Sequence, residues 1–151
     1  MRIYGCLQTK FWTLSEVQNL SDQAKLLGAY LNSSMHTTML GCFRVPVGYI
    51  ADDLKWNVDV VISALAELSS INYLTYDADS SYVLIHVFLN HNPIENPNQA
   101  KHILKLFDKV PQCVSVYPHL IEILQSHKKQ LDEEFCNRLE TLSKEFPNRW
   151  S

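Results

Sequence analysis

Between residues 21 and 70 the apolar residues recur at spacings of three and four, in three separate segments. This spacing places them on one face of an α-helix and leaves the polar residues on the opposite face. We therefore predict helices over 21–31, 46–54 and 58–70. Ser21 and Asn57 are suitable N-cap residues, and Pro46 suits a first helical turn. The apolar positions are Ala24, Leu26, Leu27, Tyr30 and Leu31, then Val47, Ile50, Ala51 and Leu54, then Val58, Val61, Ile62, Leu65 and Leu68.

Residues rich in β-branched and aromatic side chains lie between and after these helices. The segment "MLGCFRV" (39–45) is β-prone, and "INYLTY" and "YVLIHVF" flank the polar link "DADSS" (77–81), which predicts a hairpin. The N-terminal stretch 1–12 alternates enough to form an edge strand. The order helix, strand, helix, turn, helix, hairpin is that of a winged helix-turn-helix. We predict a mainly α fold of the α+β class with a small antiparallel sheet.

A different pattern follows the hairpin. "NHNPIENPNQ" (90–99) holds two Asn-Pro steps and predicts a rigid, extended loop, after which Asn98 caps a helix. We divide the chain into a winged-helix domain, 1–92, and a helical extension with its exit loop, 93–151. Residues 117–146 are predicted helical, with an apolar seam that either packs back on the domain or pairs with a second copy. The seam comprises Leu120, Leu124, Leu131, Phe135, Leu139, Leu142 and Phe146, and the last five are the self-association candidates.

The composition narrows the class of protein. A chain of 151 residues suits one folded domain with a core, or a small domain with a helical extension, and a composition of 46% hydrophobic and 19% charged residues excludes a disordered chain. A net charge of −3 argues against binding nucleic acid by bulk charge. Four scattered cysteines, no signal peptide and no long apolar run predict a cytoplasmic protein with reduced thiols and no membrane contact.

Motifs for catalysis are missing from the sequence. Only four glycines occur, there is no phosphate-binding loop, and the histidines and cysteines lack metal-ligand spacing. We therefore expect no enzyme activity, no cofactor and no metal.

The segment that would read DNA in a winged helix has an unusual charge. Asn57 and Ser63 could hydrogen-bond to bases, but from residue 56 to 100 there are five acidic residues and no Lys or Arg. The acidic residues are Asp59, Glu67, Asp77, Asp79 and Glu95. A solvated acidic face or a partner interface fits this better than a DNA-docking face. The partner-interface candidates are Asp59, Val60, Ala64 and Glu67, with Val60 and Ala64 expected on the exposed side.

The best nucleic-acid candidate lies elsewhere. Lys101, Lys105 and Lys109 repeat every four residues and form a stripe on one helix face. Arg44 and Lys55 would add to it only if the fold brings them together. A lysine stripe is also the ordinary solvated side of an amphipathic helix, so both readings stay open.

Several strings together resemble the N-terminal winged-helix module of phage and prophage replication proteins, of the replisome-organiser or initiator type. These are "KFWTLSEVQNLSDQAKLLGAYL", "LGCFRVPVGYIADDLKW", "ISALAELSSINYLTYD" and the "HNPIxNPxQ" exit loop, over about the first 110 residues. The tail, with "SVYPHLIEIL" and "LETLSKEF", is similar to the ends of short prophage proteins of unknown activity. Longer members carry a further recruiting domain where this chain has a helical tail. The resemblance implies a role in or close to phage DNA replication that is performed by binding and not by catalysis.

Three hypotheses follow. The first is a non-catalytic adaptor or organiser acting on replication or other phage or host proteins, alone or as a homo-oligomer. The second is a direct DNA-binding initiator or transcriptional regulator. The third, an enzyme, has no motif behind it.

Overall fold

The computed structural model describes residues 4–148, and its helices and strands alternate in a mixed α+β arrangement. This confirms the predicted α+β class with a small antiparallel sheet. The elements are α1 (Lys10–Thr13), α2 (Ser15–Gln18), α3 (Asp22–Ser33), β1 (Cys42–Arg44), α4 (Val47–Leu54), α5 (Val58–Ser70), β2 (Leu74–Asp77), β3 (Tyr82–Ile85), α6 (Phe88–His91), α7 (Pro97–Lys109), α8 (Tyr117–Ser126), the 3-10 turn η1 (Lys128–Gln130) and α9 (Glu133–Glu145).

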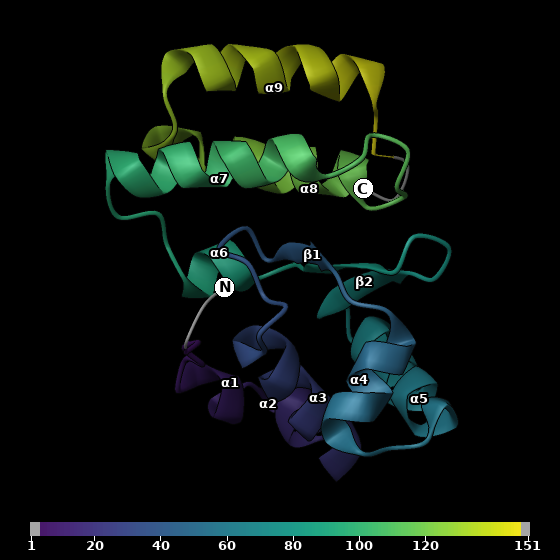
Figure 1. The fold of residues 1–151 in the computed structure, drawn as a ribbon. Coiled ribbons are helices and arrows are strands. Elements are labelled where there is room, and N and C mark those ends of the chain that lie inside the picture. The colour runs from purple at the N-terminus through teal and green to yellow at the C-terminus, as the bar shows by residue number, and fades with distance from the viewer. Residues whose placement is uncertain (1–3, 149–151) are drawn as a thin grey trace.

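The three strands form one antiparallel sheet in the order β1-β3-β2, with helices on both sides (Figure 1). Side chains alternate between the two faces of a strand. On β3, Val83 and Ile85 enter a core cluster shared with α3 and α5, while Leu84 enters a second cluster shared with α7, α8 and α9. We call these the α3–α5 core and the α7–α9 core. The sheet therefore separates two cores and contributes side chains to both.

The α3–α5 core begins with a buried aromatic anchor. Phe11 is fully buried on α1, and its ring lies 5.9 Å from that of Tyr73. A Cβ added at Gly28 would lie 2.8 Å from the Phe11 ring, so only glycine lets α3 approach so closely. The predicted N-terminal strand is wrong for the described residues, because 4–8 form no strand and Lys10–Thr13 is helical. Burial of Phe11 on a helical turn overrides the weak alternation.

The loop after the sheet is shorter than the sequence pattern predicts. Asn96, and not Asn98, caps α7, because the Asn96 side chain accepts a hydrogen bond from the backbone N–H of Gln99 at 2.9 Å. Pro97 then occupies the first helical turn, where a missing N–H costs nothing. Asn92 likewise donates a hydrogen bond to the Phe88 carbonyl and Gln99 accepts one from the Glu95 N–H, so polar side chains of this loop bond to the backbone and to helix ends.

Two helices, α8 and α9, occupy the region 117–146 that the sequence predicts to be helical. The chain leaves the helix at His127, makes the turn η1, and restarts after Asp132, which accepts a hydrogen bond from the N–H of Phe135 at 2.7 Å. The helix pair folds back on itself, with α9 covering the α7 and α8 layer (Figure 1). The apolar seam packs within the chain. Its buried members are Leu120, Leu124, Leu131, Phe135, Leu139 and Leu142, while Phe146 is half-buried.

Of the two alternatives for the five self-association candidates, packing within the chain is the one that the structure shows. Leu131, Phe135, Leu139 and Leu142 are buried in the α7–α9 core and Phe146 packs against it, so one chain covers the seam by itself. Across residues 4–148, no helix is long and apolar enough to cross a membrane.

Candidate interaction surfaces

The outer face of α5 carries apolar side chains that the sequence pattern places in the core. Val58 is 47% exposed and Ile62 is 52% exposed, whereas Val61, Leu65 and Leu68 are buried as predicted. Val58 and Ile62 are one turn apart and lie on the same side of the helix. Exposed β-branched residues at this spacing favour a protein contact over a phosphate contact.

The opposite flank of α5 is buried more deeply than expected. Ala64 is only 2% exposed, so its assignment to an exposed partner interface is wrong, and Val60 is half-buried. The reason is that α5 packs against α3 as well as against α4 and β2, which rotates the buried face toward Ala64. The sequence correctly places Asp59 and Ser63 on the exposed side.

Glu67 connects that flank of α5 to the N-terminus of α3 through two hydrogen bonds. Its two carboxylate oxygens accept hydrogen bonds from the Ser21 backbone N–H at 2.6 Å and from the Ser21 hydroxyl at 2.7 Å. These bonds favour the ionised form and lower the pKa of Glu67 below its ordinary value. Ser21 in turn accepts from the N–H of Ala24 and caps α3. Glu67 therefore carries a fixed negative charge beside the N-terminus of α3.

A shallow groove runs between Glu67 and Asp59 along α5. Its volume is about 380 Å³, and Ser21 and Gln23 form its α3 side. The groove puts two carboxylates and Ser63 on one surface, with the exposed pair Val58 and Ile62 on the far side of the same helix face. We call the set Val58, Asp59, Ile62, Ser63 and Glu67 the α5 face.

A second fixed carboxylate lies on α4. Asp53 accepts a hydrogen bond from the Tyr30 hydroxyl at 2.5 Å, and it lies 3.2 Å from Nε2 of His36. The Tyr30 bond lowers the pKa of Asp53, while burial raises that of Tyr30 above its usual range. The His36 ring also lies beside that of Tyr49, with centroids 5.5 Å apart and the ring planes tilted by 31°. These contacts join α3 and α4 and keep the anion at the surface.

The tip of the β2–β3 hairpin is tied to the C-terminal half. Asp77 accepts a hydrogen bond from the Ser115 backbone N–H at 2.9 Å, which lowers its pKa. It also accepts from the N–H of Asp79, within the tip. The hairpin that would grip a phosphate backbone in a DNA reader thus presents carboxylates and docks on its own chain.

The lysine stripe lies on the other side of the sheet. Lys101, Lys105 and Lys109 are all exposed on α7, opposite its buried residues Ile103 and Phe107. None of the three forms an ion pair with any residue in 4–148. We call this set the α7 face. Its position above the sheet, with α4 and α5 below, is visible in Figure 1.

The fold does not gather the predicted cations into one site. Lys55 ends α4 and pairs with Asp52 at 3.3 Å, and Asn57 and Ser63 lie at the start and on the outer side of α5. Arg44 ends β1, at the sheet. The sheet and the α3–α5 core lie between the α7 face and Lys55, Asn57 and Ser63, whereas Arg44 belongs to the sheet itself and pairs with Tyr82 of β3.

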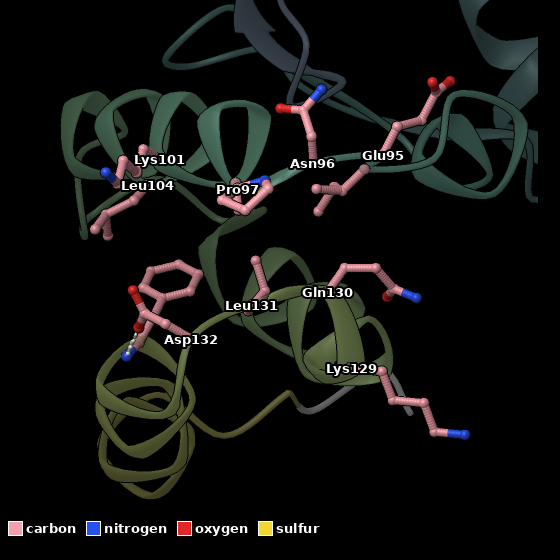
Figure 2. Close-up of a pocket in the computed structure, with 12 residues that line it drawn as sticks. Glu95, Asn96, Pro97, Lys101, Leu104, Lys129, Gln130, Leu131 and Asp132 are labelled. Atoms are coloured by element: carbon pink, nitrogen blue, oxygen red, sulfur yellow. Dashed lines mark hydrogen bonds between the residues drawn. The ribbon is translucent and has the colours of Figure 1, made fainter.

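Two further hollows lie beside the C-terminal helices, one among them and one between α8 and the sheet. A groove of about 450 Å³ separates the start of α7 from η1 and the start of α9. In Figure 2, Leu104 and Leu131 lie toward this space, whereas Glu95 and Lys129 point away from it. Its walls are therefore mainly apolar and its rim is charged.

The second hollow, of about 580 Å³, was missed by sequence reasoning. His86 Nδ1 lies 2.7 Å from the Asn72 carbonyl, so this nitrogen carries the proton and Nε2 accepts from the Thr75 hydroxyl at 2.7 Å. Burial lowers the pKa of His86, and its ring lies 4.5 Å from that of His119. The lone histidine in the strand sequence "YVLIHVF" was the available signal. Both ring nitrogens of His86 are therefore occupied by hydrogen bonds to β2 and to the residue that precedes it, Asn72 and Thr75 being the partners.

Within the described range, no group of three His, Cys, Asp or Glu side chains is arranged to hold a metal ion. Searches of family models, of curated proteins and of solved structures each found no match to this chain.

Proposed function

We propose that this chain is a non-catalytic winged-helix adaptor of the cytoplasm, linked to phage-type DNA replication, that binds another protein through the α5 face. The order α3, β1, α4, α5 and the β2–β3 hairpin supports the winged-helix assignment. The resemblance of the exit loop and helix strings to phage replication modules supports the biological setting.

One observation carries the choice of protein over DNA. The helix that enters the major groove in a winged-helix DNA reader here exposes Val58 and Ile62 beside Asp59. No Lys or Arg occurs from residue 56 to 100, so neither this helix nor the hairpin supplies a cation to a phosphate. Exposed apolar residues within an acidic surround suit a protein partner.

A photocrosslinking experiment tests this. p-Benzoylphenylalanine is placed at Ile62, and at Thr141 on the exposed side of α9 as a matched control, in cells that make the chain. We expect a discrete product from position 62 only, reduced by Asp59→Lys and identified by mass spectrometry. The purified partner should then bind the wild type and not the variant. Equal crosslinking from both positions would sink the proposal.

DNA binding through the same face is the direct rival. Fluorescence anisotropy with labelled single- and double-stranded DNA over a salt series compares the wild type with Asn57→Ala/Ser63→Ala. We expect the two proteins to be indistinguishable. Salt-dependent binding to duplex that this double variant loses would assign α5 to DNA instead.

A second candidate function rests on the α7 face. Three exposed lysines at four-residue spacing, without ion partners in residues 4–148, could follow a phosphate backbone. The same anisotropy assay compares Lys101→Glu/Lys105→Glu/Lys109→Glu with a control of equal charge change, Lys128→Glu/Lys129→Glu/Lys144→Glu. Loss of binding in the first variant alone would support this function, and no binding by the wild type at low salt would remove it.

A further inference from the structure

Two surfaces of this molecule are complementary and cannot meet within one chain. The α7 face presents Lys101, Lys105 and Lys109, and the α5 face presents Asp59 and Glu67. The sheet, with a hydrophobic core on each side, lies between them. Any contact between the two faces must therefore join different copies.

The spacing of the charges matches. Asp59 and Glu67 are eight residues apart on α5, and Lys101 and Lys109 are eight residues apart on α7. At 1.5 Å per residue both pairs span about 12 Å along the helix axis. Glu67 is held in place by Ser21, so one end of the acidic row is already ordered before any partner arrives.

Apolar groups accompany the charges on both sides. On α5 they are Val58 and Ile62, each about half exposed. Beside the lysines, His102 and Leu106 of α7 line a groove of about 350 Å³ together with the loop that holds Met35 and Met39. Met35 is 58% exposed. Methionine side chains adapt to the shape of an incoming apolar group, so this groove suits Val58 and Ile62.

We propose that the α5 face of one copy docks on the α7 face of a second copy. The contact is heterologous, because it joins two different surfaces, so each copy keeps one free face and the assembly extends beyond a dimer unless its rotation closes a ring. The inference rests on the proposed function, since it names the protein that the α5 face binds. It also moves self-association away from the C-terminal seam, which the fold buries.

Sedimentation velocity of the full chain over a range of protein concentrations tests the proposal. We expect the wild type to grow beyond a dimer at low salt and to dissociate as salt screens the charges. Lys101→Glu/Lys105→Glu/Lys109→Glu should associate at least roughly tenfold more weakly than the wild type, and so should Asp59→Lys/Ser63→Lys. The second variant leaves Glu67 and its bonds to α3 intact. Lys128→Glu/Lys129→Glu/Lys144→Glu should associate like the wild type.

Mixing the two charge-reversed variants is the decisive step. Each is expected to be monomeric alone, and together they regain both kinds of attractive contact, so the mixture should assemble. A mixture that stays monomeric, or a wild type that stays monomeric at every concentration at low salt, overturns the proposal. Circular dichroism of each variant shows that it is folded, so misfolding cannot imitate the expected loss.

Crosslinking from position 62 separates the failure of this proposal from that of the proposed function. A product of two copies, joined from position 62 to residues 97–109, supports both. A product with a different protein from a monomeric chain leaves the proposed function standing and rejects self-docking. A monomeric chain whose α7 lysines bind DNA, with no product from position 62, rejects both in favour of the second candidate function.

Discussion

The two sides of the central sheet differ in charge more than in architecture. Each side consists of helices packed on a buried apolar cluster, and on each side one helix, α5 or α7, carries exposed side chains of one charge sign along one face. Before residue 101 there are nine acidic and five basic residues, whereas from 101 onward there are seven acidic and eight basic. The net charge of −3 therefore comes from the segment before residue 101, whereas the described residues from 101 to 148 hold seven acidic and seven basic side chains and are neutral as a group. The difference teaches that the total charge of a small protein says little about its separate faces.

The two sides are nevertheless coupled through one sheet. Cys42 and Leu84 enter the α7–α9 core, and their strand neighbours Phe43 and Val83 enter the α3–α5 core. Loss of either core would expose one face of the same three strands to water. We therefore expect the two sides to unfold together.

The largest expected effect comes from removing a central side chain on each side. Phe107 packs on Tyr117 and Phe135, and Phe107→Ala should cost about 3–5 kcal/mol. Leu27→Ala in α3 should cost about 2–5 kcal/mol because Leu27 is fully buried.

Urea unfolding followed by far-ultraviolet circular dichroism and by tryptophan fluorescence measures both variants. Trp56 packs against the α3–α5 core and Trp12 lies against Phe11 of the same core, so with both proteins carrying Trp150→Phe the emission reports that side. If Phe107→Ala shifts the dichroism midpoint and leaves the fluorescence midpoint unchanged, the two cores unfold independently and the expected coupling is wrong.

A glycine at the junction of the two sides gives the next largest effect. Gly41 has φ +73°, and a Cβ added there would lie 2.5 Å from Cβ of Phe88. Gly41→Ala should destabilise the protein by about 3 kcal/mol, from backbone strain and the clash. Gly48→Ala is the matched control, because nothing lies within 4 Å of a Cβ there and alanine favours the helix α4. Thermal unfolding should show a lower midpoint for the first variant and an equal or higher one for the second.

A smaller effect is expected for the carboxylate that joins α5 to α3. Because the folded-state pKa of Glu67 is lowered, its bonds to Ser21 stabilise the fold above the unfolded pKa of about 4.3, and this contribution is lost as pH falls through the lower folded value. Glu67→Gln should cost up to about 1 kcal/mol at pH 7, since the site is partly screened by solvent.

Urea unfolding of wild type and Glu67→Gln at pH 7, 5 and 4 and below measures this difference. The gap between them should be constant at the two higher values and shrink only in the acid range. Glu16→Gln, at an exposed position of α2, serves as the control and should match the wild type. A gap that is the same at every pH would contradict the role given to the Glu67 charge.

The smallest effect is expected on the α5 face itself. Ile62→Ser should change the stability by no more than about 0.5 kcal/mol, because the side chain is half exposed. Leu65→Ala, three residues along the same helix and buried, should cost about 2 kcal/mol or more. A large loss of stability for Ile62→Ser would show that this residue supports the fold, and it would remove the main reason for reading the α5 face as a binding surface.

Local sequence determined much of the fold. The N-cap Ser21, the polar link 77–81 and the apolar spacing of 58–70 predicted α3, the hairpin and α5 because caps, turns and periodicity act over a few residues. The acidic character of the segment from 56 to 100 was equally plain. The four-residue spacing of Lys101, Lys105 and Lys109 also predicted that these lysines lie together on the exposed side of one helix.

Only the tertiary structure decided which flank of each helix is buried. The spacing of apolar residues shows that a helix has a buried stripe, but it does not show where the centre of that stripe lies. Because α5 contacts α3, α4 and β2 at once, Ala64 is buried and Val58 and Ile62 are exposed. For the same reason the seam from 117 to 146 could not be assigned to one copy or two. The break at 127–132 folds α9 back on α8, and burial within the chain then satisfies the apolar residues that a partner would otherwise have covered.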